Sequence, residues 1–379
     1  MAAYLGIGTA QQNLDAVLAY EEFVGYKADW FGCYSEQAGW DNFGTSNANY
    51  LFNSSTGRYA LLAQLGKRCL FNLALNQPFV ASYDDGSTLA DVVAGTWTSP
   101  ASVTYNIDAK YQQTAQVLID NGLADAFIKL GWEVNTPVYA WGVVISGSHA
   151  SVTNQAWVNG PTVAGAKANY ISAFQHVHDL MMAVPGAKFK FIWSPTRNDN
   201  GAGDPLGYYP GDAYVDYIGC HVYDNWYPES GQDPQNDLAN RWIRQMYGLD
   251  GPGGSGGVGQ TYRLKYFRDL ARSKGKQMII GEWGAYYSTA TPSPVANTTD
   301  SKGGDDYYFV NQMTNFINTQ TLLDGVTPLV VGHMYWERTN TASAAAALEF
   351  ASSYAGVVPA QLDLEKPLAS LAFRAGFGR

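Results

Sequence analysis

Charged residues are scarce in this sequence, and long apolar runs are missing from it. Only 15% of the 379 residues are charged, and 23 Lys and Arg stand against 33 Asp and Glu, for a formal net charge of -10. A surface that binds phosphates needs clustered Lys and Arg, so this balance argues against nucleic acid as the main partner. The same negative charge would be repelled by anionic membranes. No apolar run reaches the roughly 18 residues of a membrane span.

Cysteine is also rare, with Cys33, Cys69 and Cys220 as the three copies. An odd number cannot pair completely within the chain, and none has the Cys-x-x-Cys spacing. All three lie in apolar runs, which predicts buried free thiols. The opening residues lack the basic and apolar segments of an export signal. This leaves either a cytoplasmic location or an export signal absent from this sequence. Low lysine content and abundant Tyr, Asn, Ser and Thr favour the second, with an extracellular or periplasmic location.

Aromatic residues are what the sequence has in abundance. They make up 14% of the chain, with 11 Trp and 26 Tyr, and hydrophobic residues reach 46%. This composition is typical of a globular protein whose core needs no disulfide or metal. Aromatic rings suit the C–H faces of sugars, but they serve protein cores first. Composition alone therefore leaves both interpretations open.

Short apolar runs alternate with helical patterns along the whole chain, which is typical of repeated βα units. The expected strands are Tyr4–Gly8, Ala28–Tyr34, Arg68–Leu75, Ala126–Gly131, Phe189–Trp193, Tyr217–Tyr223, Gln277–Gly281 and Leu329–Trp336. The main expected helices are Asp108–Asn121, Ala164–Ala183, Tyr262–Lys274, Asp306–Thr319 and Ala344–Tyr354. Eight such units predict a single (β/α)8 (TIM) barrel domain over residues 1–379, with long loops on its C-terminal face.

A doubly wound open sheet is the alternative fold. It would usually carry a glycine-rich phosphate turn after the first strand, and Gly6-Ile7-Gly8 lacks the third glycine. The glycine-rich segment Gly251–Gly259 has no Gly-Lys-Ser/Thr ending and is typical of a loop. The five histidines show no metal-binding spacing, and no Gly-x-Ser-x-Gly motif occurs. We therefore expect no cofactor and no catalytic metal.

Two glutamates follow strands that face each other in a barrel of eight. Glu133 comes after the fourth strand and Glu282 after the seventh. The active site of such a barrel lies at the carboxyl ends of its strands. Glycoside hydrolysis needs two carboxylates, and neighbouring Trp132 and Trp283 would partly desolvate this pair. Each glutamate alone could equally be a structural ion-pair partner, so the hypothesis depends on the two together.

Several motifs then occur in a fixed order along the chain. They are Gly131-Trp132-Glu133-Val134-Asn135, Trp193-Ser194-Pro195, Tyr208-Tyr209-Pro210-Gly211-Asp212 and Gly281-Glu282-Trp283-Gly284. In these motifs the chain resembles glycoside hydrolase family 26 and its relatives in clan A, which are retaining enzymes that act on β-linked glycans. Tyr4-Leu5-Gly6 and Glu22-Phe23-Val24-Gly25 resemble the start of the same family. The resemblance extends over most of the chain.

The resemblance implies a role for particular side chains. Glu133 would be the general acid/base and Glu282 the nucleophile. Tyr223 would hydrogen-bond Glu282, Trp336 would stack on the reacting sugar, and Trp141 and Trp193 would line neighbouring subsites. The full set of expected substrate-binding residues is Trp132, Asn135, Trp141, Trp193, Tyr223, Trp226, Trp283 and Trp336. The sequence does not decide whether His221, inside the sixth strand, is a core residue or lies beside the site.

One position departs from the family. Its mannan-cleaving members carry His before the acid/base, whereas this chain has Trp132, whose indole is a donor with no acceptor. The expected substrate is therefore a β-mannan, a β-glucan or a bacterial exopolysaccharide. Long loops favour endo action by a monomer. A transglycosylase that processes exopolysaccharide and a non-catalytic carbohydrate-binding barrel are the alternative functions.

Overall fold

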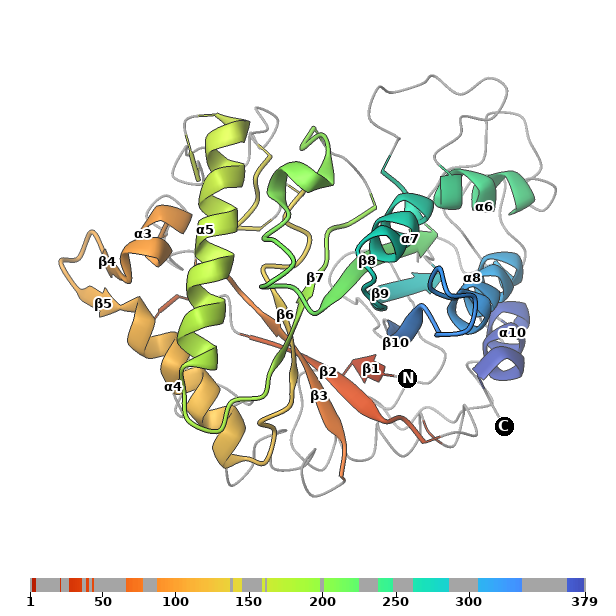
Figure 1. Cartoon of the computed structure of the whole chain (residues 1–379), viewed down its shortest axis with the longest axis horizontal. Coiled ribbons are helices and arrows are strands. Elements are labelled where there is room, and N and C mark those ends of the chain that lie inside the picture. The colour runs from red at the N-terminus through yellow and green to blue at the C-terminus, as the bar shows by residue number, and fades with distance from the viewer. Residues whose placement is uncertain are drawn as a thin grey trace. The chain divides into compact units, whose positions relative to one another are not determined.

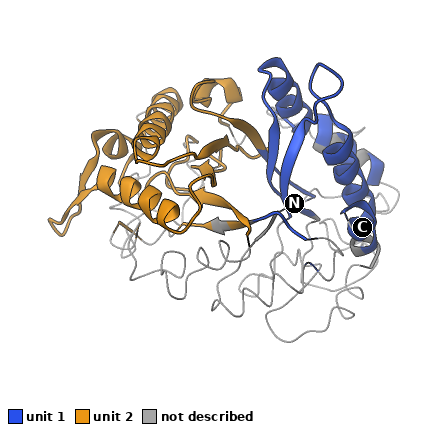
Figure 2. Ribbon diagram, turned by 60° about the horizontal axis from the view of Figure 1, so that its bottom comes forward, with its two compact units in different colours: residues 1–31, 220–379 blue, residues 32–219 orange. Residues whose placement is uncertain are grey.

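A computed structural model gives the fold of the chain. It describes residues 2–4, 21, 27–35, 39–40, 43, 66–77, 87–136, 139–144, 159–160, 162–197, 201–224, 238–247, 262–285, 306–335 and 367–377. The chain divides into two compact units, one made of Gly32–Gly219 and the other of Met1–Phe31 with Cys220–Arg379 (Figure 2). Both boundaries between the units fall inside strands, β2 (Trp30–Tyr34) and β8 (Tyr217–Asp224).

Parallel strands form the centre of the Gly32–Gly219 unit. The strand β3 (Arg68–Leu73) pairs with β6 (Phe127–Leu130), with Asn72 opposite Lys129. The strand β6 pairs with β7 (Lys190–Trp193), which in turn pairs with the start of β8. All four residues of β6 are buried, which is typical of a strand covered on both faces.

Helices follow these strands (Figure 1). They are α3 (Leu89–Ala94), α4 (Ile107–Asp120) and α5 (Val163–Met182), with the short 3-10 turn η3 (Pro205–Tyr208) before β8. Each of the three helices begins at a side-chain cap, Thr88, Asn106 and Thr162 respectively. The strands β4 (Thr96–Thr98) and β5 (Thr104–Asn106) form an antiparallel hairpin between α3 and α4.

The second unit holds β1 (Ala2–Tyr4), β9 (Met278–Ala285) and β10 (Val330–Tyr335), in which β10 pairs in parallel with both β1 and β9. Its helices are α6 (Leu238–Tyr247), α7 (Leu264–Ser273), α8 (Tyr307–Thr319) and α10 (Pro367–Phe377). The carboxylate of Asp306 caps α8 by accepting from the Phe309 amide at 2.8 Å.

The strand order confirms the predicted fold class. Among the described residues, the eight parallel strands follow the order β1-β10-β9-β8-β7-β6-β3-β2 of a closed barrel, with helices between them in the chain. This makes β6 the fourth barrel strand and β9 the seventh, as the sequence predicted. The first strand begins earlier than expected, at Ala2. The helix expected over Ala344–Tyr354 lies outside the described residues.

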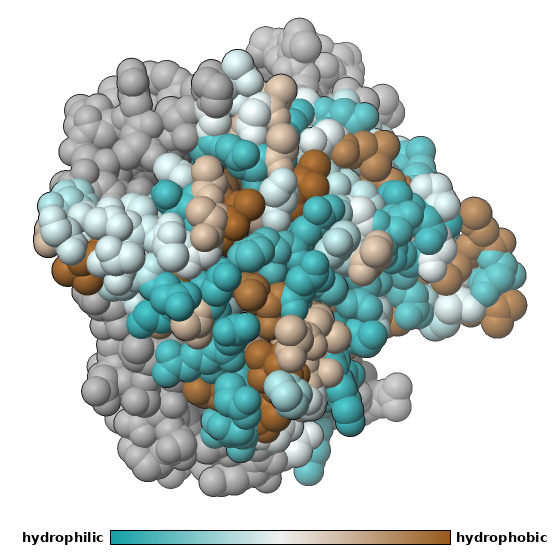
Figure 3. Space-filling model, turned by 60° about the vertical axis from the view of Figure 1, so that its left-hand side comes forward, coloured by the Kyte–Doolittle hydropathy of each residue, from teal (hydrophilic) through white to brown (hydrophobic). Residues whose placement is uncertain are grey.

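In the part of the chain that the structure describes, the α-helices range from 6 to 20 residues in length. None of the helices there combines the length and the apolar character that a bilayer crossing requires. On the face drawn in Figure 3, hydrophobic residues are scattered in small groups among hydrophilic ones. The described part of that face therefore has no broad apolar patch.

Candidate active site

The turn that follows β6 holds Glu133 in an unusual backbone conformation. Glu133 has φ 50 and Gly131, two residues earlier, has φ 55. Glycine adopts this left-handed region at little cost, but a glutamate is strained there. Such strain persists only where the surroundings fix the backbone, and it is found most often at functional sites. Among the described non-glycine residues only Ser102, in an exposed bend, shares a positive φ with Glu133.

Backbone hydrogen bonds hold this turn in place. The Glu133 amide donates to the Ser194 carbonyl, just after β7, at 2.9 Å. The Glu133 carbonyl accepts from both the amide and the hydroxyl of Thr136, each at 2.9 Å. The phenol of Tyr170 on α5 donates to the Gly131 carbonyl at 3.3 Å. The main chain of Glu133 is thus fixed by β7 and by its own turn, while its side chain stays partly exposed.

Asn135 is buried and joins two strand ends, which differs from its expected contact with substrate. Its amide nitrogen donates to the Thr196 carbonyl at 2.8 Å, and its carbonyl oxygen accepts from the Thr196 amide at 2.9 Å. Because both ends of the side chain pair with the backbone after β7, Asn135 positions the Glu133 turn. The expected contact of Asn135 with substrate stays a prediction beside this structural role.

Trp132 lies in an aromatic cluster. Its ring contacts Tyr34, Tyr139 and Trp141 edge to face, at centroid distances of 5.0, 5.2 and 4.5 Å. The residue is only 1% exposed, and its indole nitrogen lacks a hydrogen-bond partner in the described part of the chain. The aromatic contacts therefore hold the ring next to the Glu133 turn, and its expected contact with sugar stays a prediction.

Trp141 belongs to this aromatic cluster. It is fully buried, it donates from Nε1 to the Trp132 carbonyl at 2.6 Å, and it stacks on Tyr139 at 4.9 Å. Its only donor is therefore used within the protein, and its expected sugar contact stays a prediction that this burial does not support.

Trp193 also packs into the protein. It is fully buried at the end of β7 and contacts Tyr208 and Tyr209 at 5.7 and 5.0 Å. Side chains alternate between the faces of a strand, so Trp193 and Ile192 point to opposite sides. Trp193 packs against η3, and its expected subsite role stays a prediction that this burial does not support.

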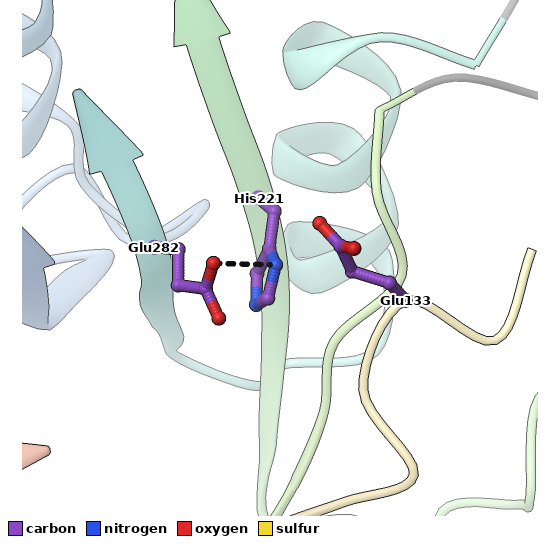
Figure 4. A group of neighbouring side chains, drawn as sticks. All are labelled: Glu133, His221 and Glu282. Carbon is purple, nitrogen blue, oxygen red and sulfur yellow. Dashed lines mark ion pairs between the residues drawn. The ribbon is translucent and has the colours of Figure 1, made fainter. Parts of the chain in front are cut away.

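Glu282 on β9 is the second candidate carboxylate, and β8 provides its partners. The Tyr223 hydroxyl donates to Glu282 Oε2 at 2.7 Å, the hydrogen bond that the sequence resemblance implied. The Nδ1 atom of His221 lies 3.4 Å from the same oxygen (Figure 4). Glu282 is 6% exposed, so its carboxylate is surrounded by protein groups such as the Tyr223 hydroxyl more than by water.

Trp283 lies on the opposite face of β9 from Glu282, in the core. It contacts Tyr335 and Phe373 at 5.0 and 5.8 Å, and its Nε1 donates to His333 Nδ1 at 3.0 Å. Burial lowers the pKa of His333 well below its usual value, which keeps the ring neutral and able to accept this bond. The expected substrate contact of Trp283 stays a prediction that this buried position does not support.

Two expected residues, Trp226 and Trp336, lie outside the described residues. One residue that sequence reasoning left undecided, His221, lies beside Glu282. Its position two residues before Tyr223 was the available signal, because residues i and i+2 of a strand share a face.

Comparisons with known proteins agree with this architecture. No protein-family model matches the chain. Over 113 residues the sequence is 32% identical to endoglucanase H of Acetivibrio thermocellus, a match that covers 28% of this chain and only 12% of that protein.

Solved structures are similar over nearly the whole chain. A double mutant of the endo-beta-1,4-mannanase of Cellulomonas fimi has a TM-score of 0.53 at 16% identity, covering 95% of this chain and 68% of that one. The GH26C protein of Muricauda sp. MAR_2010_75 has a TM-score of 0.50 at 14% identity, covering 92% and 79%. The chain therefore has the barrel fold found in glycoside hydrolase family 26 mannanases.

Proposed function

We propose that this protein is a retaining glycoside hydrolase of the family 26 kind, acting on a β-linked polysaccharide. Glu282 is the nucleophile and Glu133 is the general acid/base. The observation that carries the proposal is the geometry of Glu282 within β9, the seventh barrel strand. It is nearly buried and receives the Tyr223 hydroxyl at 2.7 Å. The strained Glu133 turn after the fourth strand supports it independently.

The proposed reaction has two displacements. In the first, an oxygen of Glu282 attacks the anomeric carbon, the glycosidic C–O bond breaks, and Glu133 gives its proton to the leaving oxygen. In the second, Glu133 takes a proton from water, whose oxygen attacks the same carbon and releases Glu282. Inversion occurs twice, so the product keeps the β configuration.

The environments of the two carboxylates suit these roles. A nucleophile must stay ionised, and hydrogen bonds to a carboxylate favour its charged form. Glu282 has such a donor in Tyr223. An acid/base must exchange protons with leaving group and water, and the partly exposed side chain of Glu133 permits this exchange.

The test is activity on soluble β-mannan, mixed-linkage β-glucan, xylan and bacterial exopolysaccharide, with the anomer of the first product followed by NMR. We expect β product from at least one substrate and none from Glu282→Gln. Product chain lengths separate endo hydrolysis from transglycosylation, in which an acceptor sugar replaces water. Binding without turnover on every substrate would contradict the proposal and favour a carbohydrate-binding barrel.

A further inference from the structure

His221 lies within β8 on the same face as Tyr223. The flanking Cys220 and Val222 are buried on the other face. His221 is itself fully buried, and its Nδ1 lies 3.4 Å from Glu282 Oε2. Glu282 Oε2 is thus approached by two polar groups from one strand, with the Tyr223 hydroxyl at 2.7 Å (Figure 4).

Burying an imidazole in an apolar strand is costly unless the ring has a polar partner. The neighbouring strand positions Ile218, Cys220 and Val222 are all apolar and buried. An ionised carboxylate only accepts hydrogen bonds, so the contact is favourable in the tautomer whose proton lies on Nδ1, the ring nitrogen that faces Glu282.

We propose that His221 is a positioning residue for the nucleophile. The proposal rests on the catalytic role proposed above for Glu282. His221 and Tyr223 together hold Oε2, which restricts rotation of the carboxylate and leaves Oε1 as the attacking atom. The donor at Nδ1 also favours the ionised carboxylate.

Three substitutions test whether position 221 needs a hydrogen-bond donor at the place of Nδ1 or only a side chain that fills the space of the ring. His221→Asn keeps a donor near the Nδ1 position, His221→Gln moves it toward the Nε2 position, and His221→Leu removes it. We expect His221→Leu and His221→Gln to lower kcat about 10- to 100-fold with KM changed less than about threefold. The acid limb of the kcat/KM profile should move to higher pH. His221→Asn should stay within about fivefold of the wild type in kcat.

His176→Leu is the matched control. It breaks another His–carboxylate pair, with Asp108 at 2.8 Å between α4 and α5, and should leave both kcat and the acid limb unchanged. Thermal unfolding of every variant reports folding. His221→Gln tests the proposal even if His221→Leu does not fold.

The proposal is overturned if folded His221→Gln retains the wild-type acid limb and kcat, or if His221→Asn loses as much as His221→Gln. Failure of the underlying function would look different. In that case Glu282→Gln would retain turnover, or the wild type would have none.

Discussion

Glu133 and Glu282 are held in opposite ways, and the difference matches their proposed tasks. Glu133 is fixed through its main chain, with φ 50 and backbone hydrogen bonds to Ser194 and Thr136, and its side chain is partly exposed. Glu282 has an extended strand backbone, and the β8 side chains Tyr223 and His221 hold its carboxylate. A general acid/base must reach both the leaving group and water with its carboxylate, so fixing its main chain is enough. A nucleophile must hold its carboxylate in one orientation toward the anomeric carbon.

The largest effect we expect in the Glu133 region comes from Glu133→Ala. Loss of the general acid/base should lower kcat about 10²- to 10⁴-fold on a natural glycan. With an aryl glycoside, whose leaving group needs no proton, azide should restore turnover and give a β-glycosyl azide. Absence of this product in an otherwise folded variant would argue that Glu133 is not the acid/base.

Tyr223→Phe tests the side-chain support of Glu282. It removes one hydrogen bond to a charged group, so we expect kcat to fall about 10- to 100-fold. The acid limb of the pH profile should rise, because the ionised carboxylate loses a donor. Azide should not restore the activity of this variant, because Tyr223 supports Glu282 and not the acid/base Glu133. Restored activity would contradict this division of roles.

Gly131→Ala tests the backbone support of Glu133. The backbone of residue 131 would have to keep φ 55, which is strained for alanine. The new methyl would lie 3.1 Å from Leu75 and 3.2 Å from Tyr170. We expect unfolding to cost about 2 kcal/mol less, together with lower activity. Gly186→Ala is the control, because Gly186 also has positive φ but meets only Ile119, at 3.6 Å. Equal losses of stability, measured in urea, would show that crowding at the turn is unimportant.

The smallest effect concerns the core behind Glu282. Burial lowers the pKa of His333, so below about pH 6.5 the unfolded chain binds a proton that the folded protein resists. The free energy of unfolding is therefore not reduced by this residue above that pH. Below it, the free energy of unfolding falls by at most about 1.4 kcal/mol per pH unit. Between pH 7.5 and 5.5, the free energy of unfolding measured in urea should fall less for His333→Gln than for the wild type. An equal fall in both proteins would contradict the lowered pKa of His333.

Most of the barrel could be predicted because its strands are continuous apolar runs, such as Phe127–Leu130, buried on both faces. The α3 helix and the β4-β5 hairpin were missed. They fall in a segment of short polar residues, where local capping by Thr88 and cross-strand contacts such as Trp97–Tyr105 decide the structure. Such contacts leave little periodic signal in a sequence.

The candidate site was predicted unevenly for a related reason. The two glutamates and Tyr223 follow from strand ends and motif order. The full burial of Trp193 and Trp283 was not predicted, although strand alternation turns both into the protein while their neighbours face the other way. That alternation was readable in the sequence. The pairing of Asn135 with Thr196 was not, because an asparagine at a strand end can bind backbone or ligand equally well.

The most direct test is to identify the residue that bonds covalently to sugar. A 2-deoxy-2-fluoro β-glycoside with a good leaving group, matched to the preferred substrate, should accumulate as a glycosyl-enzyme. Peptide mass spectrometry should then place the label on Glu282. A label on another carboxylate, or turnover with inverted product and no labelled peptide, would contradict the account.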